Sequence, residues 1–180
     1  MIDHANAVLH NGIGRYDVAL EAASAACRHD ELGSAATLPE LVEAATRSGQ
    51  PRLAESALER LVERTQACGT DWAIGVQLSS RALLSDGSGA EEVHQDAIYR
   101  LEHTQGVVDL ARTHLTHGEW LRRESRRGDA RTHLRLAHDM LAAIGAAGFA
   151  ARAASSRSLT SPLVGSSGTC ERTGRPTSSK

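Results

Sequence analysis

The stretch from residue 107 to residue 153 constrains the fold most, because its apolar residues repeat with the period of an α-helix. In its second half, five residues recur at steps of four and three and so share one face: Ala130, Leu134, Ala137, Leu141 and Ile144. In its first half, four residues do the same: Val108, Ala111, Leu115 and Gly118. An arginine-rich turn separates the two runs, so we predict an antiparallel helical hairpin with a seam of small residues. A third short helix is expected after Gly145.

The opposite face of the first helix in this hairpin is polar. Arg112, Glu119 and Arg122 lie on it, and we expect them to face water. Aromatic residues make up only 3% of the chain, and no run alternates between apolar and polar residues. These features favour an all-α fold over one containing a β-sheet.

The rest of the chain repeats the hairpin plan. Helices are expected to begin after Gly14 and after Gly49, and these two glycines are about 35 residues apart. That distance is close to the period of tetratricopeptide-like helix-turn-helix repeats. Another turn at residues 85–89 precedes a further helix, and Thr37 followed by Pro39 is a typical helix start. We predict seven to nine helices stacked as antiparallel hairpins in a short right-handed α-solenoid.

We expect two parts, a helical-repeat domain at residues 1–154 and a disordered tail at residues 155–180. The tail consists mainly of Ser, Thr, Gly, Arg and Pro and has no periodic apolar face. Such a segment buries too little apolar surface to offset the entropy lost on ordering.

Charge and cysteine content limit the classes of partner and the compartment. The net charge of −2 does not require a nucleic acid or an anionic membrane as partner. Cys27, Cys68 and Cys170 show no CxxC spacing, which favours reduced thiols. No leader follows Met1 and no apolar run reaches the roughly 20 residues of a membrane span. We therefore expect a cytoplasmic protein that does not contact a membrane.

An ordered series of segments resembles one known family. NGIGRYDVALEAA, LPELVEAATRSGQPRLAESALERL, GTDWAIGVQLSSRALLSDG and the run from Ala111 to Ala153 are similar to the helical-repeat region of large LuxR-type transcriptional regulators. The resemblance covers roughly residues 5–153. It implies a sensor or coupling segment, since in that family an ATP-binding domain precedes the repeats and a DNA-binding helix-turn-helix domain follows them.

The chain departs from that family at both ends. A phosphate-binding loop needs Lys after a glycine-rich turn, and the only lysine is Lys180. Residues 159–162 faintly resemble the opening of the DNA-binding domain, but no amphipathic helices follow. We hypothesise a truncated or frameshifted regulator that alone binds neither ATP nor DNA. A downstream reading frame without a helix-turn-helix in the encoding DNA would refute this hypothesis.

Histidines offer one candidate for metal chemistry. His114 and His117 lie one helical turn apart and Glu119 is near in sequence, so a metal site is conceivable. A chance pair is the favoured interpretation, because the chain has nine histidines and a closed site needs about four ligands. His133 and His138 are expected to be solvated. We expect no bound metal, no cofactor and no catalytic residues, and hence no enzyme.

The basic cluster is the one candidate for contact with a partner. Six arginines form it: Arg122, Arg123, Arg126, Arg127, Arg131 and Arg135. They could contact phosphates or an acidic protein surface. A solvated turn with local ion pairs is the favoured alternative, because no nucleic-acid motif accompanies them. The candidate contact residues are Arg122, Arg123, Arg126 and Arg127 with Trp120, although Trp72 and Trp120 are more typical of helix-packing anchors.

Two functions are expected from these sequence features. The first is a fragment of a LuxR-type regulator that carries its sensor or coupling segment. The second is a free-standing tetratricopeptide-like scaffold that binds a protein or peptide in its groove. A scaffold needs terminal helices with polar outer faces, whereas Ile2, Val8, Leu9 and Ile13 near the start are apolar, which favours the fragment. A small helical enzyme has only the histidines in its favour.

Overall fold

The computed structural model describes residues 1–29 and 33–159, and this part of the chain consists of helices and short turns without any β-strand. The helices are α1 (Ile2–Gly12), α2 (Tyr16–His29), the 3₁₀ turn η1 (Gly33–Ala36), α3 (Leu38–Arg47), α4 (Pro51–Cys68), α5 (Asp71–Ala82), α6 (Ser88–Glu102), α7 (Val107–Arg123), α8 (Arg127–Ala143) and α9 (Ala147–Ser158). The all-α class is therefore confirmed. No helix in the described ranges is long and apolar enough to cross a membrane.

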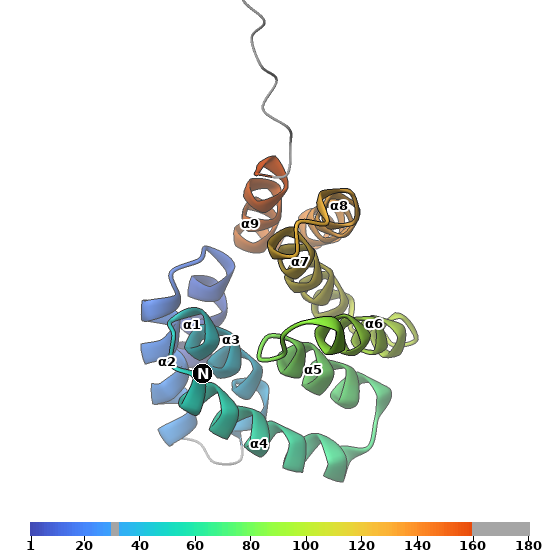
Figure 1. The fold of residues 1–180 in the computed structure, drawn as a ribbon. Helices are drawn as coiled ribbons and strands as arrows, with labels where there is room; N and C mark the ends of the chain where they lie inside the picture. The colour runs from blue at the N-terminus through green and yellow to red at the C-terminus, as the bar shows by residue number, and fades with distance from the viewer. Residues whose placement is uncertain (30–32, 160–180) are drawn as a thin grey trace, which may run out of the picture.

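Consecutive helices form antiparallel pairs: α1 with α2, α3 with α4, α5 with α6, and α7 with α8 (Figure 1). A recurring turn joins several of them. Gly14, Gly49 and Gly145 each adopt a positive φ two residues before the next helix starts, and Ser125 occupies the same place before α8 with φ 63°. Glycine is favoured there because a side chain clashes with the backbone in the left-handed region.

The predicted small-residue seam lies between α7 and α8. Ala130, Leu134, Ala137 and Leu141 are fully buried, whereas Ile144, expected on the same face, is 42% exposed just after α8. Val108, expected in the seam from α7, is 47% exposed and lies outside it. A β-carbon on Gly118 would lie 2.7 Å from Cγ of Leu134, so glycine permits the close approach of the two helices.

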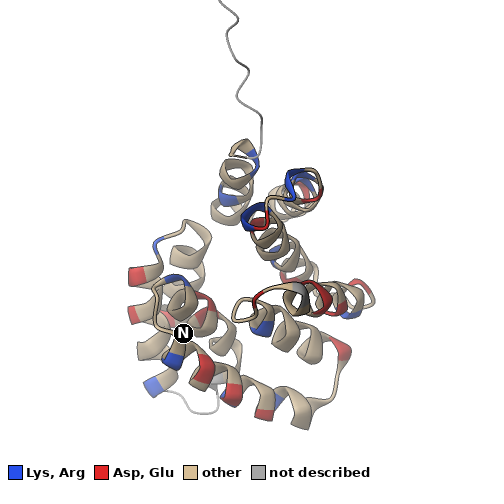
Figure 2. Cartoon of the chain, in the orientation of Figure 1, with Lys and Arg blue, Asp and Glu red and all other residues tan. Residues whose placement is uncertain are grey.

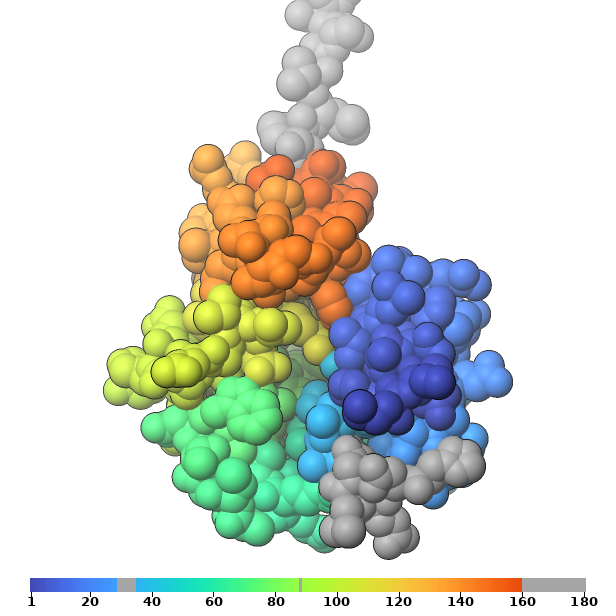
Figure 3. Space-filling model, turned by 180° about the vertical axis from the view of Figure 1, so that it is seen from behind, coloured from blue at the N-terminus to red at the C-terminus, as the bar shows by residue number. Residues whose placement is uncertain are grey.

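The odd-numbered helices α1, α3, α5, α7 and α9 form an inner ring, since each packs against the next and α9 packs against α1. The even-numbered helices lie outside them (Figure 1). Figure 3 shows the C-terminal helices in orange against the N-terminal helices in blue. Phe149 of α9 lies over Gly12 of α1, where a β-carbon would come within 2.9 Å of the ring.

This closure bears on the expected solenoid. In a solenoid each repeat contacts only its neighbours, but here the first and last helices of the described chain also meet. Stacked hairpins are present, while the solenoid arrangement stays a prediction.

The helical part extends slightly beyond the expected boundary between domain and tail. Helix α9 continues through Ser158, four residues beyond residue 154, and Ser156 is buried and donates a hydrogen bond to Glu119. The expected disorder of residues 160–180 falls outside the described residues.

Candidate functional site

Charged side chains occupy the centre of the inner ring. Three acids and three arginines from α3, α7 and α9 form the central ion cluster: Glu40, Glu43, Arg47, Arg112, Glu119 and Arg152. Their side chains are between 3% and 19% exposed. Buried charges of this kind are stable only when they are paired.

Two sets of ion pairs connect α3 with α7. Arg112 donates to both carboxylate oxygens of Glu40, at 2.5 and 3.0 Å, and to Oε2 of Glu43 at 2.9 Å. Arg47 pairs with Glu119. Arg47 follows Glu40 by seven residues and Glu119 follows Arg112 by seven, so two turns separate the contacts on both helices and the helices run parallel.

Arg152 brings α9 into the cluster. It donates to Oε1 of Glu43 at 2.8 Å, to both oxygens of Glu119 at 2.8 Å, and to the backbone oxygen of Asn11 at 3.1 Å. Asn11 in turn donates to Oε2 of Glu40 at 2.9 Å. The network therefore joins the end of α1 to α3, α7 and α9.

These charges persist because they compensate each other. Burial opposes ionisation of Glu43, but the positive charges of Arg152 and Arg112 lower its pKa to about 2. Arg152 likewise outweighs burial and lowers the pKa of Glu119. Both carboxylates are ionised and held in ion pairs at neutral pH. This environment makes them structural charges and unsuited to donate protons as general acids.

This cluster corrects the expectation that Arg112 and Glu119 face water. The two side chains are 15% and 6% exposed and point into the ring. A two-helix hairpin leaves one face free, whereas α7 is also covered by α5 and α9. The pairs of Arg112 with Glu40 and of Arg47 with Glu119 each span 72 residues, so no local spacing indicated them.

Beside the central ion cluster lies the central cleft, with a volume of about 580 Å³. It is formed by α1, η1, α3, α4, α5 and α7, and most of its lining is apolar: Val8, Ala35, Ala36, Pro39, Leu61, Ala73, Val76 and Val108. Arg112 and Glu40 lie at its inner side. This volume is in the range of sites for small organic molecules.

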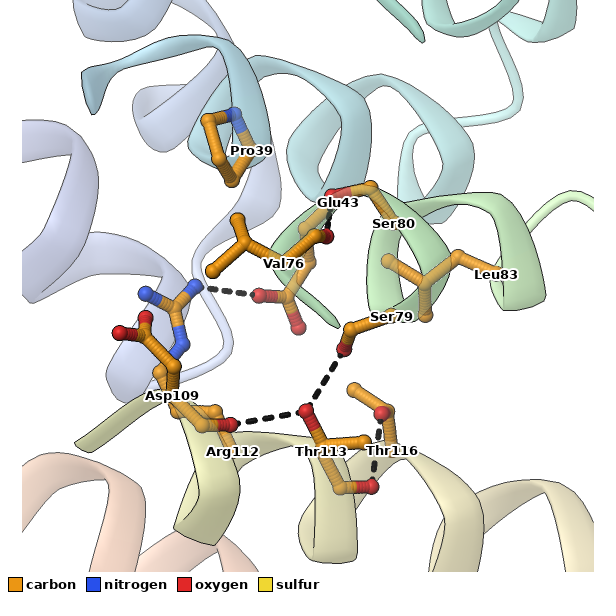
Figure 4. Close-up of a pocket in the computed structure, with 10 residues that line it drawn as sticks. All are labelled: Pro39, Glu43, Val76, Ser79, Ser80, Leu83, Asp109, Arg112, Thr113 and Thr116. Carbon is orange, nitrogen blue, oxygen red and sulfur yellow. Dashed lines mark hydrogen bonds and ion pairs between the residues drawn. The ribbon is translucent and has the colours of Figure 1, made fainter. Parts of the chain in front are cut away.

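A small cavity of about 40 Å³ continues the cleft inward between α3, α5 and α7 (Figure 4). Pro39, Val76, Asp109 and Arg112 line both spaces. On its far side Thr113 donates from Oγ1 to the backbone oxygen of Asp109 at 2.8 Å, and the same Oγ1 lies 2.9 Å from Oγ of Ser79, whose hydroxyl can donate to it. The cavity has room for ordered water at the polar end of the cleft.

The rim of the cleft carries Trp72 and Cys68. Trp72 is 47% exposed, donates from Nε1 to Oδ2 of Asp109 at 2.7 Å, and packs on Gly106. It thus joins α5 to the start of α7, in part as a packing anchor. Cys68 is an exposed free thiol, whereas Cys27 is buried.

The residues expected to contact a partner are not gathered in one place. Trp120 is only 4% exposed and packs against the rings of His94 and His117. Arg122 is half-buried, and Arg123, Arg126 and Arg127 are exposed. Arg126 pairs with Glu91 at 2.6 Å and with Asp129 at 2.7 Å, as the solvated-turn interpretation expects.

Histidines from three helices form a cluster. Nδ1 of His114 lies 2.9 Å from Nδ1 of His133, and the ring of His117 lies between those of His133 and His94, at 4.3 and 4.7 Å. His133 is therefore half-buried and hydrogen-bonded, not solvated as predicted. Glu119 points away into the central ion cluster, and no group of three potential ligands in the described ranges is placed to hold a metal.

Burial and the neighbouring rings keep these histidines neutral. The pKa of His94 is lowered to about 3, and those of His114 and His117 to about 4, with burial as the largest cause in each case. Several charged groups lie near the cluster and act on its rings. They come from α3, α6, α7, α8 and the turn before α8: Arg47, Glu91, Arg123, Asp129 and Arg126. The cluster is a neutral core element at pH 7.

No protein-family model matches the chain, and no curated protein matches it at a significant level. The assignment of a function therefore depends on the residues, on the geometry of the central cleft and on the resemblance described above.

Proposed function

We propose that this chain is the helical-repeat sensor and coupling segment of a LuxR-type transcriptional regulator, and that it binds a small, mainly apolar molecule in the central cleft. The ordered resemblance over residues 5–153 supports the regulator assignment. The observation that carries the ligand assignment is the cleft itself, whose volume is about 580 Å³. In this proposal the segment works by binding and not by catalysis.

The central ion cluster supports a preformed site. Arg112 lines the cleft while it is held by three hydrogen bonds to Glu40 and Glu43. The charge of Arg112 is already compensated, so the cleft offers an apolar wall and, at its inner side, an arginine that is already paired. A ligand of mainly apolar surface with one polar group fits this chemistry better than a charged one.

The alternative is a free-standing scaffold that binds an extended peptide along its concave face. In stacked helical hairpins the concave face is made by the inner helices. Here the central ion cluster fills the middle of that face, and α9 packs against α1. A long peptide would have to displace paired charges, which disfavours this alternative.

Fluorescence titration with N-phenyl-1-naphthylamine, an apolar dye of suitable size, tests the proposal. We expect saturable enhancement with one site per chain. Val108 lines the cleft and Val107 does not, although the two are 47% and 45% exposed. The variant Val108→Asp should weaken the binding of the dye at least tenfold, while Val107→Asp should leave the affinity for the dye unchanged.

Three outcomes would contradict the proposal. The first is the absence of saturable dye binding, and the second is an equal effect of the two aspartate variants. The third is measurable binding of ATP or duplex DNA by this chain, because the proposal assigns those activities to other domains of the family. Protection of Cys68 from a maleimide by the dye gives an independent check, since this thiol lines the cleft.

A further inference from the structure

The outer face of α8 carries a stripe of positive charge that the central cleft does not use. Arg127, Arg131 and Arg135 follow one another at steps of four residues and are exposed. Figure 2 shows basic residues in blue along α8. Within the described ranges the side chains of Arg127 and Arg131 form no hydrogen bond or ion pair. Helix α8 packs against α7 and α9, and its outward face is not covered by another described helix.

Local pairing accounts for only part of this stripe: Arg135 lies four residues before Asp139 and, after His138, its positive charge helps to lower the pKa of that carboxyl. Like charges four residues apart on a helix repel each other. Arg127 also lies in the first turn of α8, where the helix dipole disfavours positive charge. The one acidic residue in the first turn, Asp129, is already paired with Arg126 at 2.7 Å.

A groove runs beside the stripe. The α8 groove has a volume of about 740 Å³ and is lined by Gly128, Arg131, Thr132, Arg135, Leu136, Asp139 and Arg157. Three of these residues are arginines and one is an acid. Leu136 is 45% exposed within it, and a side chain at Gly128 would meet no other atom within 4 Å. The groove thus combines one exposed leucine with an excess of positive charge.

We propose that the α8 groove binds an acidic amphipathic helix of a partner protein. Residues four apart on a helix are about 6 Å apart along its axis. A partner helix with carboxylates four residues apart therefore matches Arg131 and Arg135, which line the groove, in spacing, and Arg–carboxylate pairs are geometrically specific. An apolar residue beside these carboxylates on the partner helix would cover Leu136, as in helix-in-groove recognition.

An acidic helix fits better than a nucleic acid. The chain has a net charge of −2, and no aromatic side chain lines the groove for base stacking. An exposed leucine contributes to a protein interface but not to contacts with phosphates. This inference uses a surface outside the central cleft and does not depend on the proposed function.

Fluorescence anisotropy with a labelled synthetic helix tests the inference. The probe is an alanine-rich peptide with Glu at every fourth position and Leu on the same face, compared with a peptide of identical composition in scrambled order. We expect the ordered peptide to bind at low salt at least tenfold more tightly than the scrambled one, and to weaken as salt rises. Arg131→Glu with Arg135→Glu should reduce its affinity at least tenfold.

The matched control is Arg28→Glu with Arg52→Glu, which changes the net charge equally at two exposed arginines on α2 and α4. The affinity of this control variant for the ordered peptide should lie within about twofold of that of the original chain. The inference is overturned if both double variants lose binding equally, if the ordered peptide binds no better than the scrambled one, or if a 20-base-pair duplex binds more tightly than the peptide. Circular dichroism of each variant verifies that it is folded.

Discussion

The substitution Glu43→Gln tests whether the central ion cluster holds the inner ring together. Glu43 accepts hydrogen bonds from Arg112 at 2.9 Å and from Arg152 at 2.8 Å, and its side chain is 5% exposed. Its pKa falls from an ordinary 4.5 to about 2 in the folded chain. At about 1.4 kcal/mol per pKa unit, the fold is about 3 kcal/mol more stable with Glu43 ionised at neutral pH than with Glu43 protonated.

Glutamine keeps the shape of the side chain but removes its charge, and it leaves two buried arginines with less compensation. We therefore expect Glu43→Gln to lower the free energy of unfolding by about 3 kcal/mol, which corresponds to a fall in Tm of roughly 6–12 °C for a chain of this size. Urea denaturation followed by circular dichroism measures the first quantity and calorimetry the second.

The dependence on pH sharpens this test. Because the pKa of Glu43 is lower in the folded state, its contribution is complete above about pH 4.5 and is lost as the pH falls toward 2. The difference between the original chain and Glu43→Gln should then be the same at pH 7 and pH 5.5. A difference that changes over this range would mean that another group carries the effect.

The matched control is Asp96→Asn, which removes an exposed acid that pairs with Arg100 at 3.3 Å on one helix. Exposed pairs of this kind contribute about 0.5 kcal/mol or less. If Glu43→Gln lowered the free energy of unfolding by no more than Asp96→Asn does, the central ion cluster would not stabilise the ring. It would then not hold the cleft in a preformed state either.

Three further predictions concern the histidine cluster and the turns. The pKa values of His94, His114 and His117 lie below the ordinary 6.5, so the unfolded chain binds more protons as the pH falls from about 6.5 to 4 and the free energy of unfolding decreases. We expect the free energy of unfolding, measured by urea denaturation, to be lower at pH 5 than at pH 7 by up to about 2 kcal/mol per histidine. A free energy of unfolding that does not change between pH 7 and pH 5 would contradict this prediction. Gly49 has a φ of 71° and no atom near its missing β-carbon, so Gly49→Ala should destabilise by about 1 kcal/mol through backbone strain alone. Ser125 occupies the same position of its turn with φ 63°, so Ser125→Gly should stabilise by about 0.5 kcal/mol in thermal melts, and a loss of stability would refute the shared turn.

The helices could be predicted because their signals are local. Thr37 and Pro39 mark the start of α3, and Gly14 and Gly49 lie in turns with positive φ as the repeat pattern indicates. The face from Ala130 to Leu141 is buried as its period requires. The arginines indicate the turn before α8, but Ser125 gives no sign of a left-handed conformation, because serine rarely adopts it.

The central site could not be predicted because its contacts are not local. Arg112 and Glu119 have the spacing of a solvent-exposed face, and their partners on α3 lie 72 residues away. The periodicity of one helix identifies its most apolar face but gives no information about whether the polar face meets opposite charges from another helix. The same reason explains His133, whose partner His114 lies on the neighbouring helix.

The closure of the ring connects the stability of the fold to the proposed sensing role. Glu119 pairs with Arg47 of α3 and with Arg152 of α9, so two inner helices depend on one carboxylate of α7. The same helix α7 contributes Val108, Asp109 and Arg112 to the central cleft. A ligand that shifts α7 by even a fraction of a turn would therefore strain ion pairs on both α3 and α9, because packed, charge-paired interfaces resist gradual deformation. Ligand binding in the cleft should accordingly either leave the ring rigid and raise its Tm, or break the contact of α9 with α1, and protection of the amides of α9 from hydrogen exchange distinguishes the two results.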